Sequence, residues 1–296
     1  MELQQLRAFT TIAKVGSFTK AAELLDYAQS SISAQIHSLE TELGTKLFER
    51  FGREVCLTPE GKRLLVYAEQ LLNIEAEAKE TLTGNNEPQG TLTICAPESL
   101  SIFKLPSLIQ AYKERYPKVK LVLKLGSCSD IHNWVRKNIA DCGFLLGTPA
   151  NPSDLVMKPL SHEPMTLIAR NNHPLVAKGC CTPKDLEGED LIQIEESDCI
   201  YRLIFEAQLA EAGVQPGAVF EFGSVETTKK CVISGMGISL LPRMTVEQEI
   251  KTGELKDLQW TGSDFNIFTQ LFYHKDKWLS PALTALVQLA EEVLIN

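Results

Sequence analysis

The sequence has no long apolar run and no signal-like N-terminus. No stretch of about 18 or more consecutive apolar residues occurs in the 296-residue chain, so no transmembrane helix is predicted. The first residues, Met1 to Gln5, lack the basic start and apolar stretch of a signal peptide, and we therefore expect a cytoplasmic protein with no membrane partner. A chain of this length is expected to form about two domains.

Enzyme motifs are missing as well. The sequence contains no GxSxG turn, no GxGxxG after the first strand of its α/β part, no Walker loop and no HExxH pair. The eight cysteines include no CxxC pair and no cluster with histidine, so we expect reduced, mostly buried thiols. An enzyme is therefore a weakly supported alternative, and we expect no catalytic site, no metal and no cofactor.

Positive charge is scarce. The formal net charge of −9 argues against a protein that coats nucleic acid without selectivity. The first 60 residues carry six Lys and Arg against eight Asp and Glu. If this segment binds DNA, its positive charge must be local, and the placement of the acidic residues decides whether it can.

Three helices are predicted in the first 44 residues. Apolar residues recur at helical spacing over residues 1–15, and Gly16 ends that run. Ser17 can cap a second, short helix, and a third helix runs from about Gln29 to Leu43 and stops at Gly44. Two helices joined by about three residues form a helix-turn-helix, which places its second helix in the DNA major groove.

The third helix has an exposed face without acidic residues. Its apolar residues fall on one stripe, and the opposite face carries small hydroxyl residues and one histidine before the first acid, Glu40. Short side chains let a helix backbone approach base edges closely. The candidate DNA-reading residues are Gln29, Ser30, Ser33, Ala34 and His37. An ordinary amphipathic helix is the alternative.

A hairpin is predicted next. Residues 46–57 fit two short strands around Gly52, which is the pattern of a wing. Arg50 and Arg53 lie beside the turn, where they can contact phosphates or enter a minor groove. Ordinary solvated hairpin charges are the alternative here.

A long helix is predicted from Pro59 to about Thr83, because Thr58-Pro59-Glu60 is a strong helix start and Gly84 stops the run. Positions 64, 68, 71, 75, 78 and 82 alternate steps of four and three, with one polar break at Glu75. A lone helix with such a seam needs a partner, so we expect this linker to join two chains.

From Thr91 onward, strand and helix patterns alternate, which predicts an α/β fold with mainly parallel sheets. Two such sheets, with the chain crossing between them twice, would form a two-lobed binding module. The expected division is a winged helix-turn-helix at 1–58, a linker helix at 59–87 and an effector-binding domain at 91–296. Lobe I of that domain covers 91–162 and 268–296, and lobe II covers 163–267.

Several motifs recur in an order and spacing that resemble the LysR-type transcriptional regulators over essentially the whole chain. The matching segments are Leu6-Arg7-Ala8-Phe9, Gly16-Ser17-Phe18-Thr19-Lys20-Ala21-Ala22, Gln29-Ser30-Ser31-Ile32-Ser33-Ala34-Gln35-Ile36, Leu47-Phe48-Glu49-Arg50, Leu57-Thr58-Pro59-Glu60-Gly61 and Gly235-Met236-Gly237-Ile238-Ser239-Leu240-Leu241-Pro242. The family often has proline where Ser30 stands and arginine where Ala34 stands. Since Ala34 lacks the expected arginine contact to DNA, we expect an unusual operator or weaker DNA binding.

The resemblance implies a promoter-binding homotetramer, a dimer of dimers, that responds to a small-molecule effector and works with RNA polymerase. It also implies an all-α winged helix-turn-helix followed by two Rossmann-like lobes, similar to periplasmic solute-binding proteins. A pure solute-binding module is the alternative from another functional class. The first 60 residues and the missing signal peptide argue against it.

The effector is expected between the lobes, beyond the carboxyl ends of strands. The family's effector positions match Ser99, Ser101 and Ser127, and less closely Tyr201 and Arg202. Helix N-termini at these strand ends favour anions, so we expect a small polar or anionic metabolite. Against the anion stands Glu98, whose carboxylate would repel it if it pointed inward. Serines that only cap helices are the alternative.

Cys199 raises a separate possibility. It stands at the start of a predicted helix with Arg202 nearby, a setting that can activate a thiol. Some members of the family sense oxidants with a cysteine in this region and a resolving cysteine shortly after it. The next cysteine here is Cys231, far along the chain, so redox sensing is a minor alternative.

Overall fold

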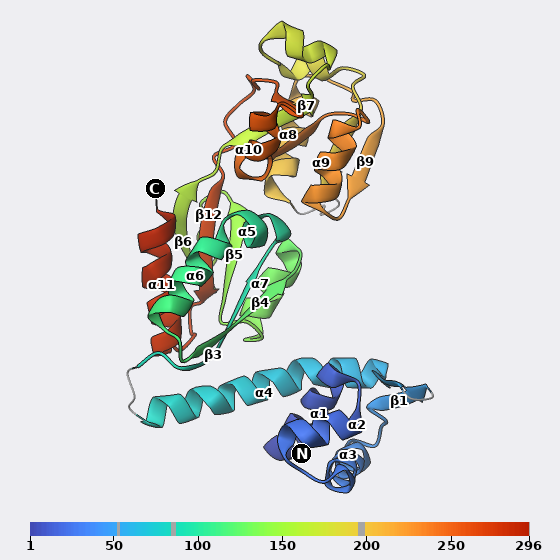
Figure 1. The fold of residues 1–296 in the computed structure, drawn as a ribbon, viewed down its shortest axis with the longest axis vertical. Helices are drawn as coiled ribbons and strands as arrows, with labels where there is room; N and C mark the ends of the chain where they lie inside the picture. The colour runs from blue at the N-terminus through green and yellow to red at the C-terminus, as the bar shows by residue number, and fades with distance from the viewer. Residues whose placement is uncertain (52–53, 84–86, 195–198, 296) are drawn as a thin grey trace. The chain divides into compact units, whose positions relative to one another are not determined.

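The computed structural model describes residues 1–51, 54–83, 87–194 and 199–295, which form two compact units (Figure 1). Unit 1 comprises Met1–Asn86 with Lys137–Ile139, and unit 2 comprises Glu87–Arg136 with Ala140–Asn296. Among the described helices, none combines the length and the apolarity needed to cross a bilayer.

Unit 1 is a winged helix-turn-helix followed by a long helix. Its elements are α1 (Leu3–Val15), α2 (Phe18–Leu25), α3 (Gln29–Leu43), β1 (Phe48–Phe51), β2 (Glu54–Leu57) and α4 (Pro59–Thr83). Ser17 caps α2 by accepting a hydrogen bond from the Lys20 backbone N–H at 3.3 Å. Gly16 and Gly44 end α1 and α3 with φ of 65° and 66°, a conformation that glycine adopts without strain.

The wing is fixed to the helical core. Phe9 of α1 is fully buried, and the Phe48 ring at the start of β1 packs against it with centroids 5.3 Å apart. Thr58 links the end of the wing to α4, because its Oγ1 donates to the Lys46 carbonyl at 2.7 Å and accepts from the Gly61 N–H at 2.9 Å. The hairpin, α3 and the start of α4 are therefore held as one body.

The seam predicted for α4 is partly wrong. Ala68 is fully buried in the core of unit 1, and Glu75 forms an ion pair with Arg7 of α1, so both residues face their own domain. The side of α4 that contains them is already occupied by α1.

A different row of apolar side chains on α4 is exposed. Tyr67, Leu71 and Ile74 are 63%, 37% and 53% exposed, and Ala78 continues the row at the same helical spacing. We call these four residues the α4 stripe. It shares Leu71 and Ala78 with the predicted seam.

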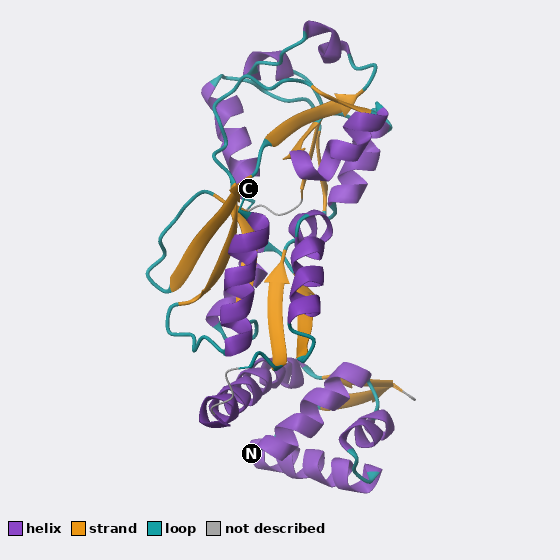
Figure 2. Ribbon diagram, turned by 60° about the vertical axis from the view of Figure 1, so that its left-hand side comes forward, coloured by secondary structure: helices purple, strands orange, loops and turns teal. Residues whose placement is uncertain are grey.

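Lobe I of unit 2 is built on a five-stranded sheet. Its elements are β3 (Gly90–Ala96), α5 (Glu98–Phe103), α6 (Leu105–Arg115), β4 (Val119–Leu125), α7 (Cys128–Arg136), β5 (Cys142–Gly147), β6 (Leu155–His162), β12 (Phe268–His274) and α11 (Pro281–Leu294). The strand order is β4-β3-β5-β12-β6. Helices cover both faces of the sheet, with α6 and α11 on one and α7 on the other (Figure 2).

Lobe II has two small sheets, β10-β7-β11 and β8-β9. Its elements are β7 (Met165–Arg170), the 3-10 turns η1 (Pro174–Lys178) and η2 (Pro183–Leu186), β8 (Leu191–Ile194), α8 (Ile200–Glu211), β9 (Val219–Phe222), α9 (Val225–Ile233), β10 (Ser239–Pro242), α10 (Arg243–Thr252) and β11 (Leu255–Asp257). The prediction of mainly parallel sheets is wrong for unit 2. Strand β12 runs antiparallel to both of its neighbours, and so does β7.

The chain crosses between the lobes twice, once from β6 to β7 and once on the way into β12. The two crossing segments are hydrogen-bonded to each other, because the Glu163 N–H donates to the Ile267 carbonyl at 2.7 Å. The buried Glu163 carboxylate accepts from Ser161 Oγ and Thr269 Oγ1 at 2.7 Å and pairs with Lys104 at 2.8 Å.

Candidate nucleic-acid interface and ligand cleft

Helix α3 presents its predicted polar face to solvent. Gln29, Ser30, Ala34 and His37 are exposed, and Ser33 is half-buried. The Gln29 amide donates to Ser33 Oγ at 2.9 Å. Ile32, Ile36 and Leu39 of its apolar stripe are buried in the core of unit 1, whereas Leu43 at the end of the helix is exposed. All five predicted DNA-reading residues thus lie on the solvent side of α3.

Glu40, the first acid of α3, is held in an ion pair. Its carboxylate accepts from Lys46 Nζ at 2.7 Å and from the Leu47 N–H at 2.9 Å. Burial raises the pKa of Glu40, but the hydrogen bonds from Lys46 and from the Leu47 and Phe48 backbones outweigh it, so the pKa lies below its usual value. This acid is therefore compensated within unit 1, which eases the shortage of positive charge near the reading face.

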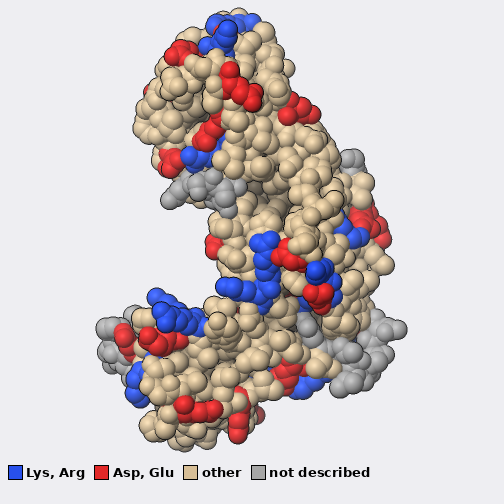
Figure 3. All heavy atoms as spheres, turned by 180° about the vertical axis from the view of Figure 1, so that it is seen from behind, with Lys and Arg blue, Asp and Glu red and all other residues tan. Residues whose placement is uncertain are grey.

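A groove lies alongside α3, and Ser33 and His37 line it together with Lys46 and Phe48. On the face shown in Figure 3, Lys and Arg side chains lie among Asp and Glu side chains and do not gather in one field. On this face the described cations therefore offer DNA single positive charges, without a broad basic field.

The wing is present as an antiparallel hairpin, with Glu49 opposite Cys56. Arg53 and the side chain of Arg50 lie outside the described residues. Their predicted phosphate contacts stay predictions.

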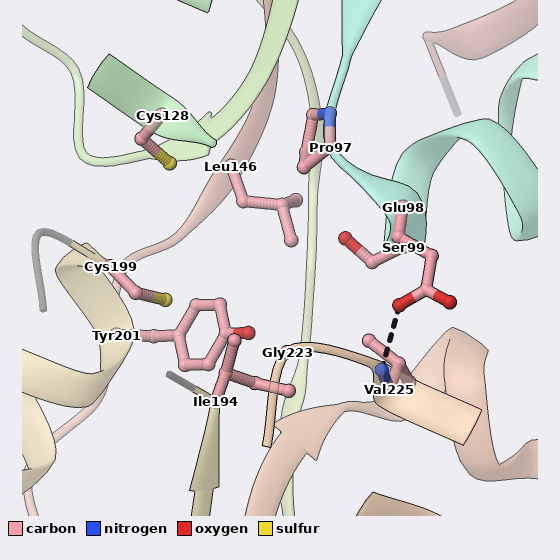
Figure 4. A pocket seen from close by; sticks show the side chains of 10 residues that line it. All are labelled: Pro97, Glu98, Ser99, Cys128, Leu146, Ile194, Cys199, Tyr201, Gly223 and Val225. Atoms are coloured by element: carbon pink, nitrogen blue, oxygen red, sulfur yellow. Dashed lines mark hydrogen bonds between the residues drawn. The ribbon is translucent and has the colours of Figure 1, made fainter. Parts of the chain in front are cut away.

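A cavity of about 40 Å³ lies between the two lobes of unit 2 (Figure 4). Lobe I contributes Pro97, Glu98, Ser99, Cys128 and Leu146. Lobe II contributes Ile194, Cys199, Tyr201, Gly223 and Val225. Most of these residues stand where a strand ends and a helix begins. The sequence predicted three of these junctions, at the starts of α5, α7 and α8. The junction of β9 and α9 was missed, although Gly223-Ser224 after a strand was a signal for it.

Glu98 connects the lobes across this cavity. Its carboxylate accepts from the Ser224 hydroxyl at 2.9 Å. It also accepts from the Val225 N–H at 2.7 Å (Figure 4). Val225 is the first residue of α9, so a lobe I carboxylate caps a lobe II helix and lies at the positive end of its dipole.

The three predicted effector serines differ in their surroundings. Ser99 is 5% exposed and lines the cavity, and its hydroxyl points into it (Figure 4). Ser127 caps α7, because its Oγ accepts from the Asp130 N–H at 3.2 Å and donates to the Asp130 carboxylate at 2.8 Å. Ser101 Oγ is buried with no partner among the described residues, and Ser101 does not line the cavity.

Of the two predicted lobe II residues, only Tyr201 lines the cavity. Arg202 is not among the residues that line it. Its guanidinium pairs with Glu206 at 2.9 Å, contacts Glu221 and donates to the Ile194 carbonyl at 2.7 Å. The structure therefore gives Arg202 carboxylate partners within lobe II and does not place it as a counter-ion in the cleft.

Cysteines reach the cavity from both lobes. Cys128 and the buried Cys199 line it, whereas Cys231 lies half-buried on α9. Among the described residues, no group of three or more His, Cys, Asp and Glu side chains is arranged to hold a metal ion.

A winged helix-turn-helix with a solvent-facing second helix, joined to a two-lobed α/β module with a cleft, defines a DNA-binding regulator that senses a small molecule. The profile of the bacterial regulatory helix-turn-helix protein, lysR family, matches residues 3–62, and that of the LysR substrate binding domain matches residues 85–295. The HTH-type transcriptional regulator YwqM of Bacillus subtilis (strain 168) is 40% identical over 293 residues, covering 99% of each chain.

Solved structures agree with the fold. Full-length OxyR C199D from Pseudomonas aeruginosa gives a TM-score of 0.72 at 24% identity, covering 99% of this chain and 94% of that one. Full-length CbnR in complex with its target DNA gives 0.70 at 20% identity, covering 99% and 100%. The chain belongs to the LysR family of transcriptional regulators. It is a DNA-binding transcriptional regulator with an effector-binding domain, and not an enzyme.

Proposed function

We propose that α3 reads base edges in the major groove while the wing holds the DNA backbone. The observation that carries this proposal is the exposed face of α3 on which no acid precedes the paired Glu40. The reading residues are Gln29, Ser30, Ser33, Ala34 and His37, and the backbone contacts are assigned to Arg50 and Arg53. Because Ala34 supplies no charged donor, specificity must come from short hydrogen-bonding groups and the histidine.

A gel-shift titration with the DNA upstream of the protein's own gene tests this docking. Ser33→Glu should abolish specific binding, because it adds a carboxylate against acceptor-rich base edges and phosphates. Leu43→Glu is the control for an added carboxylate on α3, since Leu43 is 40% exposed and lies ten residues from Ser33, about 15 Å along the helix axis. Arg53→Ala should weaken binding to all sequences and reduce the salt slope by about one unit. Parent-like footprints for both Ser33→Glu and Arg53→Ala would rule the docking out.

We propose further that the effector binds in the cavity between the lobes. Ser99 and Tyr201 are assigned direct contact, and Ser101, Ser127 and Arg202 are assigned support of the helices that present them. The support for this location is the convergence of both lobes on one cavity. In a thermal-shift screen, a stabilising compound should lose affinity several-fold with Ser99→Ala and with Tyr201→Ala, while operator binding is kept. A compound indifferent to both substitutions would place the site elsewhere.

From family membership we propose that the chain acts in the cytoplasm as a tetramer of two dimers on promoter DNA, with RNA polymerase as a further partner. The α4 stripe is proposed as the surface that joins two chains, because its apolar side chains are exposed. Footprinting of the promoter with and without RNA polymerase tests the partner, and independent, non-overlapping footprints would argue against contact.

A further inference from the structure

The described lining of the cavity is acidic. Among the described residues that line the cavity, Glu98 is the only one with a charged side chain, and none is Lys, Arg or His. The nearest candidate cation expected from the sequence, Arg202, is engaged with Glu206 and Glu221. Within the described part of the lining, an anion entering the cavity would therefore meet one carboxylate and no compensating cation.

Two helix N-termini that could attract an anion already hold carboxylates of the chain itself. The N-terminus of α9 is capped by Glu98. The N-terminus of α7 is capped reciprocally, because the Ser127 N–H donates to the Asp130 carboxylate at 3.3 Å and the Asp130 N–H donates to Ser127 Oγ. The dipole charge of these two helices is thus largely compensated before any ligand arrives.

Glu98 and Ser99 together offer a receiving site for N–H donors. A carboxylate has about four lone-pair sites, and Ser224 and Val225 use two of those of Glu98. Ser99 is 5% exposed, and its hydroxyl points into the cavity, where it can accept a hydrogen bond from a ligand. The Tyr201 ring lies across the cavity from Glu98 (Figure 4), where an aromatic face can attract a cation.

We propose that the cleft takes a small ammonium compound, with Glu98 and Ser99 accepting from its N–H groups and its apolar part against Leu146 and Ile194. This inference rests on the proposed effector role of the cleft, and it replaces the anion expected from helix ends alone. The cavity volume of about 40 Å³ suits a ligand of a few heavy atoms, since one water needs about 10–15 Å³.

The test compares three small probes of similar size on the full-length protein by ligand-observed NMR titration. They are propylammonium, neutral propionamide and propionate. Propylammonium should bind at least about tenfold more tightly than propionate. Glu98→Gln should remove that preference, because it removes the carboxylate while keeping a similar shape.

Three control variants separate charge from structure. Ser224→Ala removes one hydrogen bond to Glu98 without removing its charge, so the preference should be kept. Glu254→Gln neutralises an exposed lobe II carboxylate away from the cavity and should change nothing. Cys128 is half-buried in the lobe I wall of the cavity, and in Cys128→Phe the larger side chain would fill the cavity. This variant should abolish binding of any cleft ligand, whatever its charge. Operator binding and circular dichroism check that each variant is folded.

The outcomes distinguish the two levels of the proposal. Propylammonium preference that is lost in Glu98→Gln and kept in Ser224→Ala supports it. Propionate binding that equals or exceeds propylammonium binding, and that Cys128→Phe abolishes, overturns the charge class but keeps the cleft as the effector site. If Cys128→Phe leaves the affinity for the probes unchanged, the probes do not bind in the cleft, and the proposed effector site is refuted. No propylammonium binding at the highest concentration the protein tolerates also overturns the ammonium class.

Discussion

Replacing Ile74 by aspartate should separate the two chains that we expect the α4 stripe to join. Ile74 is 53% exposed in the single chain and lies one helical step from Leu71. In a twofold dimer each chain contributes the same stripe, so the substitution enters the interface twice. The aspartates would then face apolar side chains of the partner.

The expected weakening follows from burial and charge. Burying an isoleucine side chain is worth about 1.5–3 kcal/mol, and an unpaired carboxylate in its place adds a desolvation cost of several kcal/mol. Even about 3 kcal/mol per chain gives about 6 kcal/mol for the pair, which weakens the dimer by about 10⁴-fold. A dimer with a nanomolar dissociation constant would become a monomer at the micromolar concentrations used in solution.

Sedimentation velocity measures this directly, with Ala76→Asp as the matched control. Ala76 is exposed on α4 and lies about 200° around the helix from Ile74, off the stripe. Ile74→Asp should lower the mass to half that of the parent or less, and Ala76→Asp should leave it unchanged. If Ile74→Asp keeps the parent mass while Ala76→Asp lowers it, the interface lies on the other side of α4 and our assignment of the stripe is wrong.

Two further predictions concern paired charges. Lys229 of α9 is 3% exposed and pairs with Glu226 and Glu249 at 2.7 Å each. Lys229→Met leaves these carboxylates without their partner, so it should lower the free energy of unfolding, measured in urea, by about 3–5 kcal/mol. Adding Glu249→Gln should restore part of that loss. An unchanged cost in the double variant would contradict this pairing. Folding lowers the pKa of Glu40. Its pairing with Lys46 therefore stabilises the fold fully above about pH 4.3, where an unfolded glutamate titrates. This stabilisation is lost as the pH falls through the lowered pKa. Glu40→Gln should make unfolding of unit 1, followed by circular dichroism, less sensitive to acid, and equal acid sensitivity in the two proteins would refute the assignment.

Elements with local signals could be predicted from the sequence. Gly16, Ser17 and Gly44 each fix a helix end through their own backbone or side chain, and the observed α3 and α4 have the predicted bounds. A break between two helices of unit 2 also has a local signal. Pro106 lies in the first turn of α6, and the chain has two helices, α5 and α6, that meet at Lys104.

Contacts between distant segments could not be predicted in the same way. The heptad spacing of α4 is compatible with two rows that share Leu71, and only the position of α1 decides which row is buried. The sequence raised the orientation of Glu98 as a question, but its partner Ser224 lies 126 residues further along the chain. For Arg202 the competing partner was Glu221, on a strand whose position depends on the fold of lobe II.

The bonded crossing segments constrain how the lobes can move. Because Glu163 is fastened to Ile267 and the segments lead into the paired strands β6 and β12, they resist sliding and twisting and leave one rotation easy. Three lobe I side chains hold the Glu163 carboxylate, so this residue is fastened to lobe I. If an effector binds in the cleft as proposed, we expect it to act on the angle between the lobes.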